Sequence, residues 1–262
     1  MPRKNPLRTA LARGRLLRGP FQLLSDPAVT EILLGAGFDF ILVDAEHRPL
    51  NPETIEHLVR AAHGMGPRKS AVVRVPSIQR GAIQYALETG ADGILVPLVR
   101  SPEEAAAAVS LCRYPPLGTR GLNGIARAAG WGHPDPGAYA RAANRQLVVA
   151  VQIETPEALD QVEKIAALKG VDMLYVGPFD FSHGLGLSGQ LGHKEVRAAI
   201  SRVFQVGRRH GKWLGVLAPD RDFATWCVAQ GVRFLTYRAD VRLLKAAAKE
   251  NWLEAASIRE GK

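Results

Sequence analysis

The sequence has 262 residues, of which 47% are hydrophobic, and its formal net charge is +9 at pH 7. The hydrophobic content is sufficient for a sizeable core, but no apolar run approaches the roughly 18–20 residues of a membrane span, which argues against a membrane protein. The positive charge invites a nucleic-acid partner, yet the basic residues are mostly scattered and no recognised nucleic-acid-binding motif occurs. We therefore expect neither nucleic acid nor a membrane as partner.

Two features bear on where the protein resides in the cell. Residues 1–18 form a basic lead-in, because no acidic residue precedes Asp26. An Arg-rich, acid-free start occurs in organelle transit peptides, but early prolines and glycines interrupt the pattern here, which favours a short surface helix leading into the first strand. The two cysteines, Cys112 and Cys227, lie in helical contexts without metal-ligand spacing or a disulfide framework. This favours a reducing, cytoplasmic location.

Short apolar runs alternate with helical segments along the chain. The predicted strands cover 21–24, 38–44, 70–75, 93–99, 147–153, 171–176, 213–217 and 232–237. The predicted helices cover 26–36, 51–64, 78–89, a segment from 101, 156–168, 194–210, 220–230 and 241–256. The strict alternation predicts one α/β domain over residues 1–262, a single (β/α)₈ barrel with its C-terminal helix within 240–262. The Gly/Pro/Arg-rich connection 113–136 has the length of a functional lid or a disordered segment.

Two acidic residues stand where neighbouring apolar runs end. Glu154 follows the run 147–153, and Asp180 follows the run 171–176 after a Gly-Pro-Phe turn. Because the carboxyl ends of parallel strands form the catalytic face of α/β folds, both carboxylates should lie on one rim. Two carboxylates on one rim suit a hard divalent cation such as Mg²⁺ or Mn²⁺. The simpler alternative is that both acids only cap helices.

Further polar side chains occupy the other predicted strand ends. In a barrel they would project into the same basin as the acid pair, and their joint placement is more specific than any one of them. They are Asp44, Glu46, His47, Arg74, Gln152 and Asp240.

The predicted positions of the lysines disfavour a mechanism through a Schiff base. Such an enzyme needs a Lys whose amine reaches the basin. Lys69 and Lys212 precede predicted strands and therefore belong at the opposite face, and the other candidates lie in helices or their flanking turns. A metal ion would then have to serve as the electron sink.

Several local motifs together indicate a family. They are Gly37-Phe38-Asp39-Phe40 with Asp44-Ala45-Glu46-His47, Val73-Arg74-Val75-Pro76, Pro115-Pro116-Leu117-Gly118-Thr119-Arg120-Gly121, Gln152-Ile153-Glu154-Thr155 and Gly177-Pro178-Phe179-Asp180. In this order and spacing, over roughly residues 5–250, the chain resembles the HpcH/HpaI aldolase family of metal-dependent pyruvate aldolases. The resemblance implies a (β/α)₈ barrel whose last helix is exchanged between subunits, in a homo-oligomer that is usually a hexamer.

The resemblance also implies roles for individual residues. Glu154 and Asp180 would bind the metal, Mg²⁺ or Mn²⁺ with Co²⁺ as a further option. Gln152 would contact the substrate, and the backbone N–H groups of Phe179 and Asp180 would hold the pyruvate carboxylate. His47 would match the family's base, Arg74 would face the pyruvate oxygen, and Glu88 would stand where an Asp commonly supports the His of a neighbouring subunit. The sequence departs from the family at Glu88 and at Phe179, where a small residue is common.

The implied reaction is the reversible cleavage of a 4-hydroxy-2-oxo acid to pyruvate and an aldehyde. A metal-stabilised pyruvate enolate would form, with Arg74 facing the developing oxyanion and His47 moving the proton. Asp44 and Glu46 would order the water molecules around the metal.

The aldehyde pocket can be sketched from the strand ends. Leu217 ends the seventh predicted strand and should point toward the mouth, with Phe179 narrowing the opposite side. Arginines near the rim, which are Arg48, Arg120, Arg127 and Arg238, could reach an acidic tail. We therefore expect short or acidic aldehydes as partners of pyruvate.

Three other functions remain open at this point. A related carbon–carbon lyase acting on an acyl-CoA thioester would want a nucleotide-binding extension, which this compact chain does not show. A carbon–phosphorus enzyme of the phosphoenolpyruvate type would carry signatures that we do not find. A non-catalytic basic protein would bind polyanions in a salt-sensitive way, without metal dependence.

Overall fold

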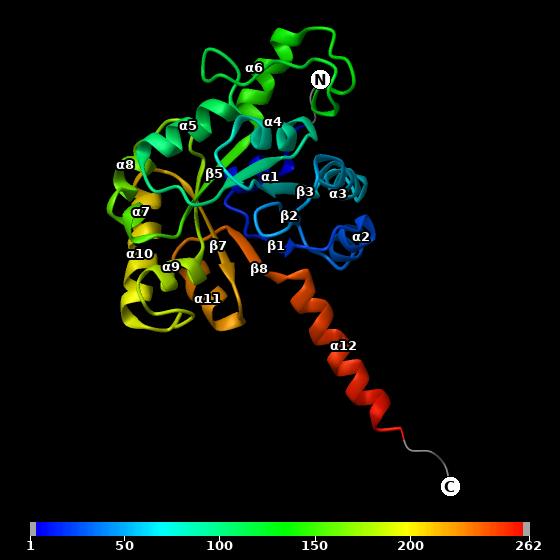
Figure 1. Ribbon diagram of the computed structural model, residues 1–262, viewed down its shortest axis with the longest axis vertical. Helices are drawn as coiled ribbons and strands as arrows, with labels where there is room; N and C mark the ends of the chain where they lie inside the picture. Colours follow the sequence, from blue (N-terminus) through cyan, green and yellow to red (C-terminus); the bar gives the residue numbers. More distant parts are fainter. Residues whose placement is uncertain (1–3, 259–262) are drawn as a thin grey trace.

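The computed structural model describes residues 4–258. Parallel strands close into a barrel in sequence order, and β8 pairs with β1 (Figure 1). The strands are β1 (Leu17–Gln22), β2 (Phe40–Asp44), β3 (Ser70–Arg74), β4 (Gly93–Val96), β5 (Val148–Ile153), β6 (Met173–Val176), β7 (Trp213–Ala218) and β8 (Phe234–Ala239). The predicted (β/α)₈ barrel is thereby confirmed.

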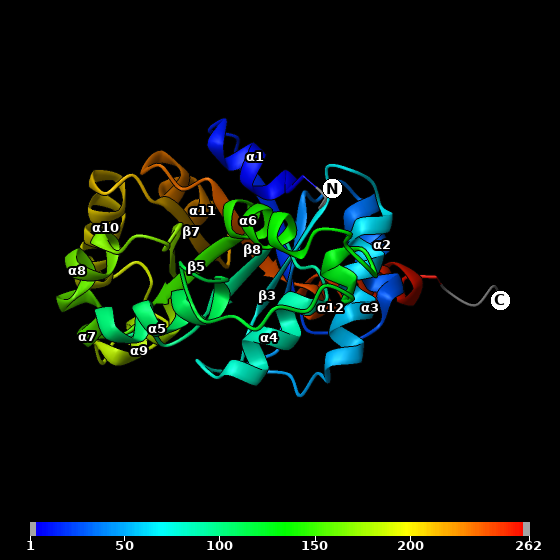
Figure 2. The ribbon, with the colours of Figure 1, turned by 90° about the horizontal axis from the view of Figure 1, so that it is seen from above.

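Helices surround the strands, as the view from above shows (Figure 2). They are α1 (Pro6–Ala12), α2 (Pro27–Gly35), α3 (Pro52–Gly64), α4 (Arg80–Glu88), α5 (Pro102–Cys112), η1 (Arg127–Ala129), α6 (Pro136–Gln146), α7 (Pro156–Asp160), α8 (Val162–Ala167), α9 (Pro178–Gly184), α10 (Lys194–Arg209), α11 (Arg221–Ala229) and α12 (Asp240–Ala256). No helix within residues 4–258 is long and apolar enough to cross a membrane.

Many of these helices begin with the same two-residue signal. A polar side chain accepts a hydrogen bond from a first-turn N–H group, and a proline occupies the first helical position, where no N–H partner is needed. The pairs are Asn5-Pro6, Asp26-Pro27, Asn51-Pro52, Ser101-Pro102, Asp135-Pro136 and Thr155-Pro156. These local signals explain why the alternation of elements can be predicted from the sequence.

The barrel interior is filled by every second residue of the strands. Phe40 and Phe234 stack across it with their ring centroids 4.0 Å apart, and Tyr175 packs edge-on against Phe234. Helix α1 covers the end of the barrel where the strands begin, and it buries Leu7 and Leu11 in the same apolar cluster. The short helix predicted at the start of the chain, leading into the first strand, is therefore present, and its apolar face closes the barrel.

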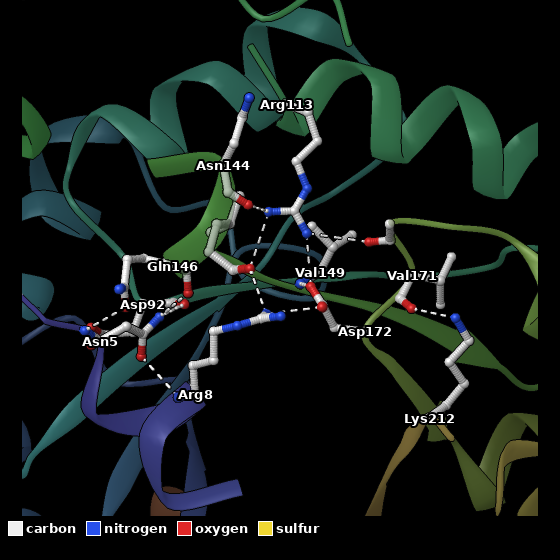
Figure 3. A network of polar contacts seen from close by, with 12 residues as sticks. Asn5, Arg8, Asp92, Arg113, Asn144, Gln146, Val149, Val171, Asp172 and Lys212 are labelled. Carbon is white, nitrogen blue, oxygen red and sulfur yellow. Dashed lines mark hydrogen bonds and ion pairs between the residues drawn. The ribbon is translucent and has the colours of Figure 1, made fainter. Parts of the chain in front are cut away.

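A polar network fastens α1 and the connection before β5 to this amino-end rim (Figure 3). Asp172, which precedes β6, pairs with Arg8 of α1 at 2.9 Å and with Arg113 at 2.8 Å. Asn5 donates from its side chain to the backbone oxygen of Asp92 at 2.6 Å. These contacts use charged groups to hold structure, which is the usual role of the rim opposite the catalytic face.

Three element predictions differ from the structure. The first strand begins at Leu17, earlier than predicted, and Pro20 lies in a register irregularity of its pairing with β8, where a missing N–H is tolerated. The long connection after α5 is followed by α6, a helix that the sequence analysis did not include. The single helix predicted over 156–168 is divided at Gln161 into α7 and α8.

Candidate active site

Every second residue of each strand faces the barrel interior, and the predicted polar residues are the last inward-facing ones, at one end of the barrel. Inward-facing positions of β2 carry Phe40 and Leu42 in the core and then Asp44. The corresponding series are Val72 and Arg74 on β3, Val148, Ala150 and Gln152 on β5, and Met173, Tyr175 and Gly177 on and after β6. The candidate active site is therefore the last inward layer of the barrel, at the carboxyl ends of the strands.

Arg74 is held by two carboxylates at the floor of this site. Its Nε and Nη2 atoms donate to Asp44 at 3.0 and 2.7 Å, and its Nη1 atom lies 2.9 Å from Glu46. The guanidinium also stacks over the Phe21 ring, 4.6 Å from the ring centroid. Burial alone would lower the pKa of Arg74, but both carboxylates oppose this and the pKa is raised. Arg74 is thus a fixed, fully ionised group in one orientation.

Glu154 is buried directly behind the wall of the site. Its Oε1 atom accepts a hydrogen bond of 2.8 Å from the backbone N–H of Leu98, and Oε2 accepts one from the side-chain amide of Gln152. Leu98 has a φ of +52°, which is uncommon for a non-glycine residue and aims its N–H at the carboxylate. Gly177 packs against the same group, since a Cβ there would collide with Glu154 Oε2.

The remaining residues open onto a cavity of about 340 Å³. His47 and Asp180 are both exposed on its wall, and Asp180 is in the first turn of α9. Phe179, 37% exposed, and Leu217 also line the cavity. Of the residues predicted to form the basin, the cavity is lined by Asp44, His47, Arg74, Gln152, Phe179, Asp180 and Leu217, while Glu46 and Glu154 lie just behind its wall.

Negative charge accumulates around Glu154. Burial is the main reason why its pKa rises to about 7, and the nearby carboxylates of Asp180 and Glu46 add to the increase. The pKa of Glu46 is also raised, mainly by burial, although Arg74 opposes the shift. Arg74, the buried cation of the site, is engaged with Asp44 and Glu46, and the pair of Glu154 and Asp180 supplies oxygen donors that suit a hard divalent ion.

The side chains alone do not complete a metal coordination shell. Within residues 4–258, no three His, Cys, Asp or Glu side chains are grouped so that they could hold a metal. A metal at Glu154 and Asp180 would therefore keep positions for water or substrate oxygens. Gln152 supports this arrangement, because its buried Oε1 atom has no hydrogen-bond partner among the described residues.

Four residues expected in the basin do not line the cavity. Glu88, the last residue of α4, is 3.1 Å from Arg120 and does not line the cavity. Arg120 and Arg127 line a second cavity of about 540 Å³ beside α6, so their predicted reach into the aldehyde pocket is not seen in this chain. Asp240 is buried and accepts hydrogen bonds from the N–H groups of residues 23 and 24 at 3.0 and 2.8 Å.

The lysine prediction agrees with the structure. Lys212 donates to the backbone oxygens of Val171 and Leu168 at 2.8 and 2.9 Å, at the amino-end rim (Figure 3). Lys69 donates to the oxygen of Phe38, which precedes β2. Both amines therefore lie at the opposite end of the barrel from Arg74, and neither lines the cavity.

Some residues of the site were not found from the sequence. Leu98, Tyr175 and Arg242 are apolar, aromatic or in a helix and belong to no motif found in the sequence, whereas Gly177 is part of the Gly177-Pro178-Phe179-Asp180 motif but received no role of its own. The inward alternation along β6, which leads from Met173 through Tyr175 to Gly177, could have identified two of them. Leu98 contributes only a backbone N–H, and Arg242 enters the site through the turn from β8 into α12.

Comparison with known proteins gives matches over nearly the whole chain. A family model described as HpcH/HpaI aldolase/citrate lyase matches residues 18–247. A 4-hydroxy-2-oxovalerate aldolase from Rhodococcus jostii (strain RHA1) is 39% identical over 242 residues, which are 92% of this chain and 92% of that protein. A hydroxypyruvate/pyruvate aldolase from Paraburkholderia phytofirmans is 36% identical over 257 residues, 97% of this chain and 98% of that protein.

A solved structure has the same architecture. The crystal structure of an HpcH/HpaI aldolase/citrate lyase family protein from Burkholderia cenocepacia J2315 superposes with a TM-score of 0.91 at 35% sequence identity. The match covers 97% of this chain and 100% of that one.

Proposed function

Because the chain belongs to the HpcH/HpaI aldolase/citrate lyase family, it is a carbon–carbon lyase, and we propose that it is a metal-dependent pyruvate aldolase. The reaction would be the reversible cleavage of a 4-hydroxy-2-oxo acid to pyruvate and an aldehyde. The observation that carries the proposal is the convergence of Glu154 and Asp180 beside Arg74 at the carboxyl end of the barrel.

Glu154 and Asp180 would hold the metal, Mg²⁺, Mn²⁺ or Co²⁺, with substrate and water oxygens as the other ligands. When bound, such an ion supplies a Lewis acid that polarises the keto group and stabilises the enolate. The backbone N–H of Leu98 and the amide of Gln152 hold the Glu154 carboxylate in place. The N–H groups of Phe179 and Asp180, in the first turn of α9 and without intrahelical acceptors, would bind the pyruvate carboxylate.

The remaining residues would stabilise the negative charge of the transition state and transfer a proton to or from the substrate. Arg74, fixed by Asp44 and Glu46, would present its guanidinium to the oxygen that becomes negative in the transition state. His47 has a side chain that is 60% exposed at the cavity, so it can exchange a proton with the hydroxyl of the substrate. Asp44 accepts the backbone N–H of His47 at 3.3 Å and thereby fixes the start of this loop.

The direct experiment measures pyruvate release from a panel of 4-hydroxy-2-oxo acids before and after chelation. We expect a chelator to abolish activity, Mg²⁺ or Mn²⁺ to restore it, and Glu154→Ala not to recover at ordinary metal concentrations. Glu31→Ala, at an exposed acid on α2, is the matched control and should respond as the unaltered enzyme does. Full activity in excess chelator would overturn the metal-dependent mechanism.

We also propose that the enzyme is a hexamer in the cytoplasm. Helix α12 extends away from the barrel (Figure 1), and Asp240 is the one buried residue among its members, all of which are described. Leu244, Trp252 and Leu253 are 61%, 66% and 53% exposed, which is a large apolar surface to leave in water. A neighbouring subunit that accepts this helix would cover it. Glu88, whose buried Oε2 atom has no partner among the described residues, would then support the His47 of another subunit.

A further inference from the structure

Two arginines at the mouth of the catalytic cavity have no acidic partner among the described residues. Arg238 is the fifth residue of β8, Arg242 lies in the first turn of α12, and both line the cavity that contains Arg74 and Asp180. Arg238 is half-buried and donates from Nε to the backbone oxygen of Pro219 at 3.1 Å. This bond fixes the plane of the guanidinium and leaves its terminal nitrogens for another acceptor.

The acidic residues nearest in the chain are already engaged. Asp240 accepts N–H groups of residues 23, 24 and 241. Asp220 caps α11 by accepting the N–H of Phe223 at 2.8 Å. Deeper in the cavity, the positive charge of Arg74 is balanced by Asp44 and Glu46. The uncompensated positive charge of the site is therefore at its mouth, on the β8 side.

The backbone at Arg238 is held in an unfavourable conformation. Its φ of +62° lies in the left-handed region, which glycine adopts freely and a long side chain does not. A residue without a side chain would be the stable choice at this point of β8, where the pairing with β1 is irregular. An arginine here therefore incurs a conformational cost, which is characteristic of residues retained for a ligand.

We propose that Arg238, assisted by Arg242, binds an anionic group at the far end of the acceptor aldehyde, and that it selects acidic over neutral aldehydes. The inference rests on the proposed aldolase function, because it assigns this part of the cavity to the aldehyde. Under that proposed function pyruvate would be held by Asp180 and the start of α9, which follows β6, two strands away around the barrel from β8. Carboxylate and phosphate share the chemistry that a planar guanidinium recognises.

The test compares aldol addition of pyruvate to 4-oxobutanoate and to its methyl ester, which differ in charge at nearly constant length. The readout is the ratio of the two kcat/KM values. We expect Arg238→Gly to lower this ratio by about tenfold or more, as befits the loss of a charge-assisted hydrogen bond. Glycine accepts the local backbone conformation, so the variant should fold. Arg238→Lys should retain part of the preference, and Arg242→Ala should show a smaller loss.

Arg202→Ala, at an exposed arginine of α10 outside the cavity, is the matched control and should leave the ratio unchanged. Glyceraldehyde 3-phosphate provides the second arm: a larger effect of Arg238→Gly on this aldehyde than on 4-oxobutanoate would identify phosphate as the preferred anion. The inference is overturned if Arg238→Gly leaves kcat/KM unchanged, relative to the methyl ester, for both 4-oxobutanoate and glyceraldehyde 3-phosphate.

Exchange of the pyruvate methyl protons with D₂O in the unaltered enzyme separates the two levels of the proposal. If exchange occurs but Arg238→Gly leaves the ratio of kcat/KM values for 4-oxobutanoate and its methyl ester unchanged, the aldolase function stands and the anion subsite is wrong. If neither exchange nor aldol addition occurs with added metal, the proposed function itself fails.

Discussion

Replacement of Arg74 by alanine should destabilise the protein and slow its reaction, and the structure gives the size of both effects. The side chain is 7% exposed and makes three charge-assisted contacts with Asp44 and Glu46. Its removal leaves the buried carboxylate of Asp44 and the partly buried carboxylate of Glu46 without a cation. Loss of one partner of a buried ion pair costs about 3–5 kcal/mol, whereas domains are typically stable by about 5–15 kcal/mol. We expect Arg74→Ala to fold, with an unfolding free energy lower by about 3–5 kcal/mol.

The decrease in unfolding free energy caused by Arg74→Ala should depend on pH in a defined direction. The attraction of Arg74 lowers the pKa of Glu46 against the larger effect of burial. Without Arg74, the pKa of Glu46 rises further above its value in the unfolded chain, so the folded variant binds more protons. Stability is then retained at low pH and is lost as the pH rises through the folded pKa of Glu46. The difference from the unaltered protein should therefore be larger at pH 8 than at pH 5.5.

Urea unfolding of Arg74→Ala, Asp44→Asn and the double variant measures the ion cluster directly. The side-chain amide oxygen that Asp44→Asn introduces can still accept the N–H groups of residues 46 and 47, so the double variant removes charge with little loss of backbone support. It should be more stable than Arg74→Ala alone. A loss below about 1 kcal/mol for Arg74→Ala would show that these carboxylates are solvated, as in surface pairs.

The catalytic effect of Arg74 is measured on the same proteins. We expect Arg74→Ala to lower kcat by roughly 10²-fold or more, because one preorganised donor to an oxyanion contributes about 2.7–4 kcal/mol. Arg74→Lys should recover only part of the lost kcat, since lysine lacks the planar guanidinium that donates two hydrogen bonds to Asp44. A change in KM alone would assign Arg74 to ground-state binding instead.

Three further variants probe the walls of the site and the assembly. Gly177→Ala places a Cβ against Glu154 Oε2, so metal titration should show weakened affinity with the fold retained, and an unaltered affinity would refute the close packing. Leu217→Ala should extend the aldehyde range and loosen stereochemical control more than it slows pyruvate methyl exchange; an equal fall in both rates would mean that Leu217 supports the metal site. Removal of the residues after Asp240 should abolish the hexamer in light scattering, and a monodisperse monomer of the full chain at micromolar concentration would contradict the assembly.

Much of the barrel could be predicted because its signals are local. Apolar runs of strand length alternate with segments that start at polar–proline caps, and each cap satisfies N–H groups within its own helix. The same alternation predicts most of the site, since Asp44, Arg74 and Gln152 continue the inward series of their strands. The helix that leads into the first strand was predicted, but the sequence did not show that it closes the barrel, because an apolar stripe does not reveal which surface it covers.

Only the tertiary structure determines the contacts between segments that are distant in the sequence. The sequence places Glu154 at a strand end, but the Leu98 N–H that orients it comes from 56 residues earlier. Arg120, Arg127 and Arg238 were equivalent as rim arginines, and the path of the connection between α5 and β5 removes the first two from the cavity. The period of a strand determines the face on which a side chain lies; which other segments meet it there depends on loop paths and close packing, to which residues far along the chain contribute.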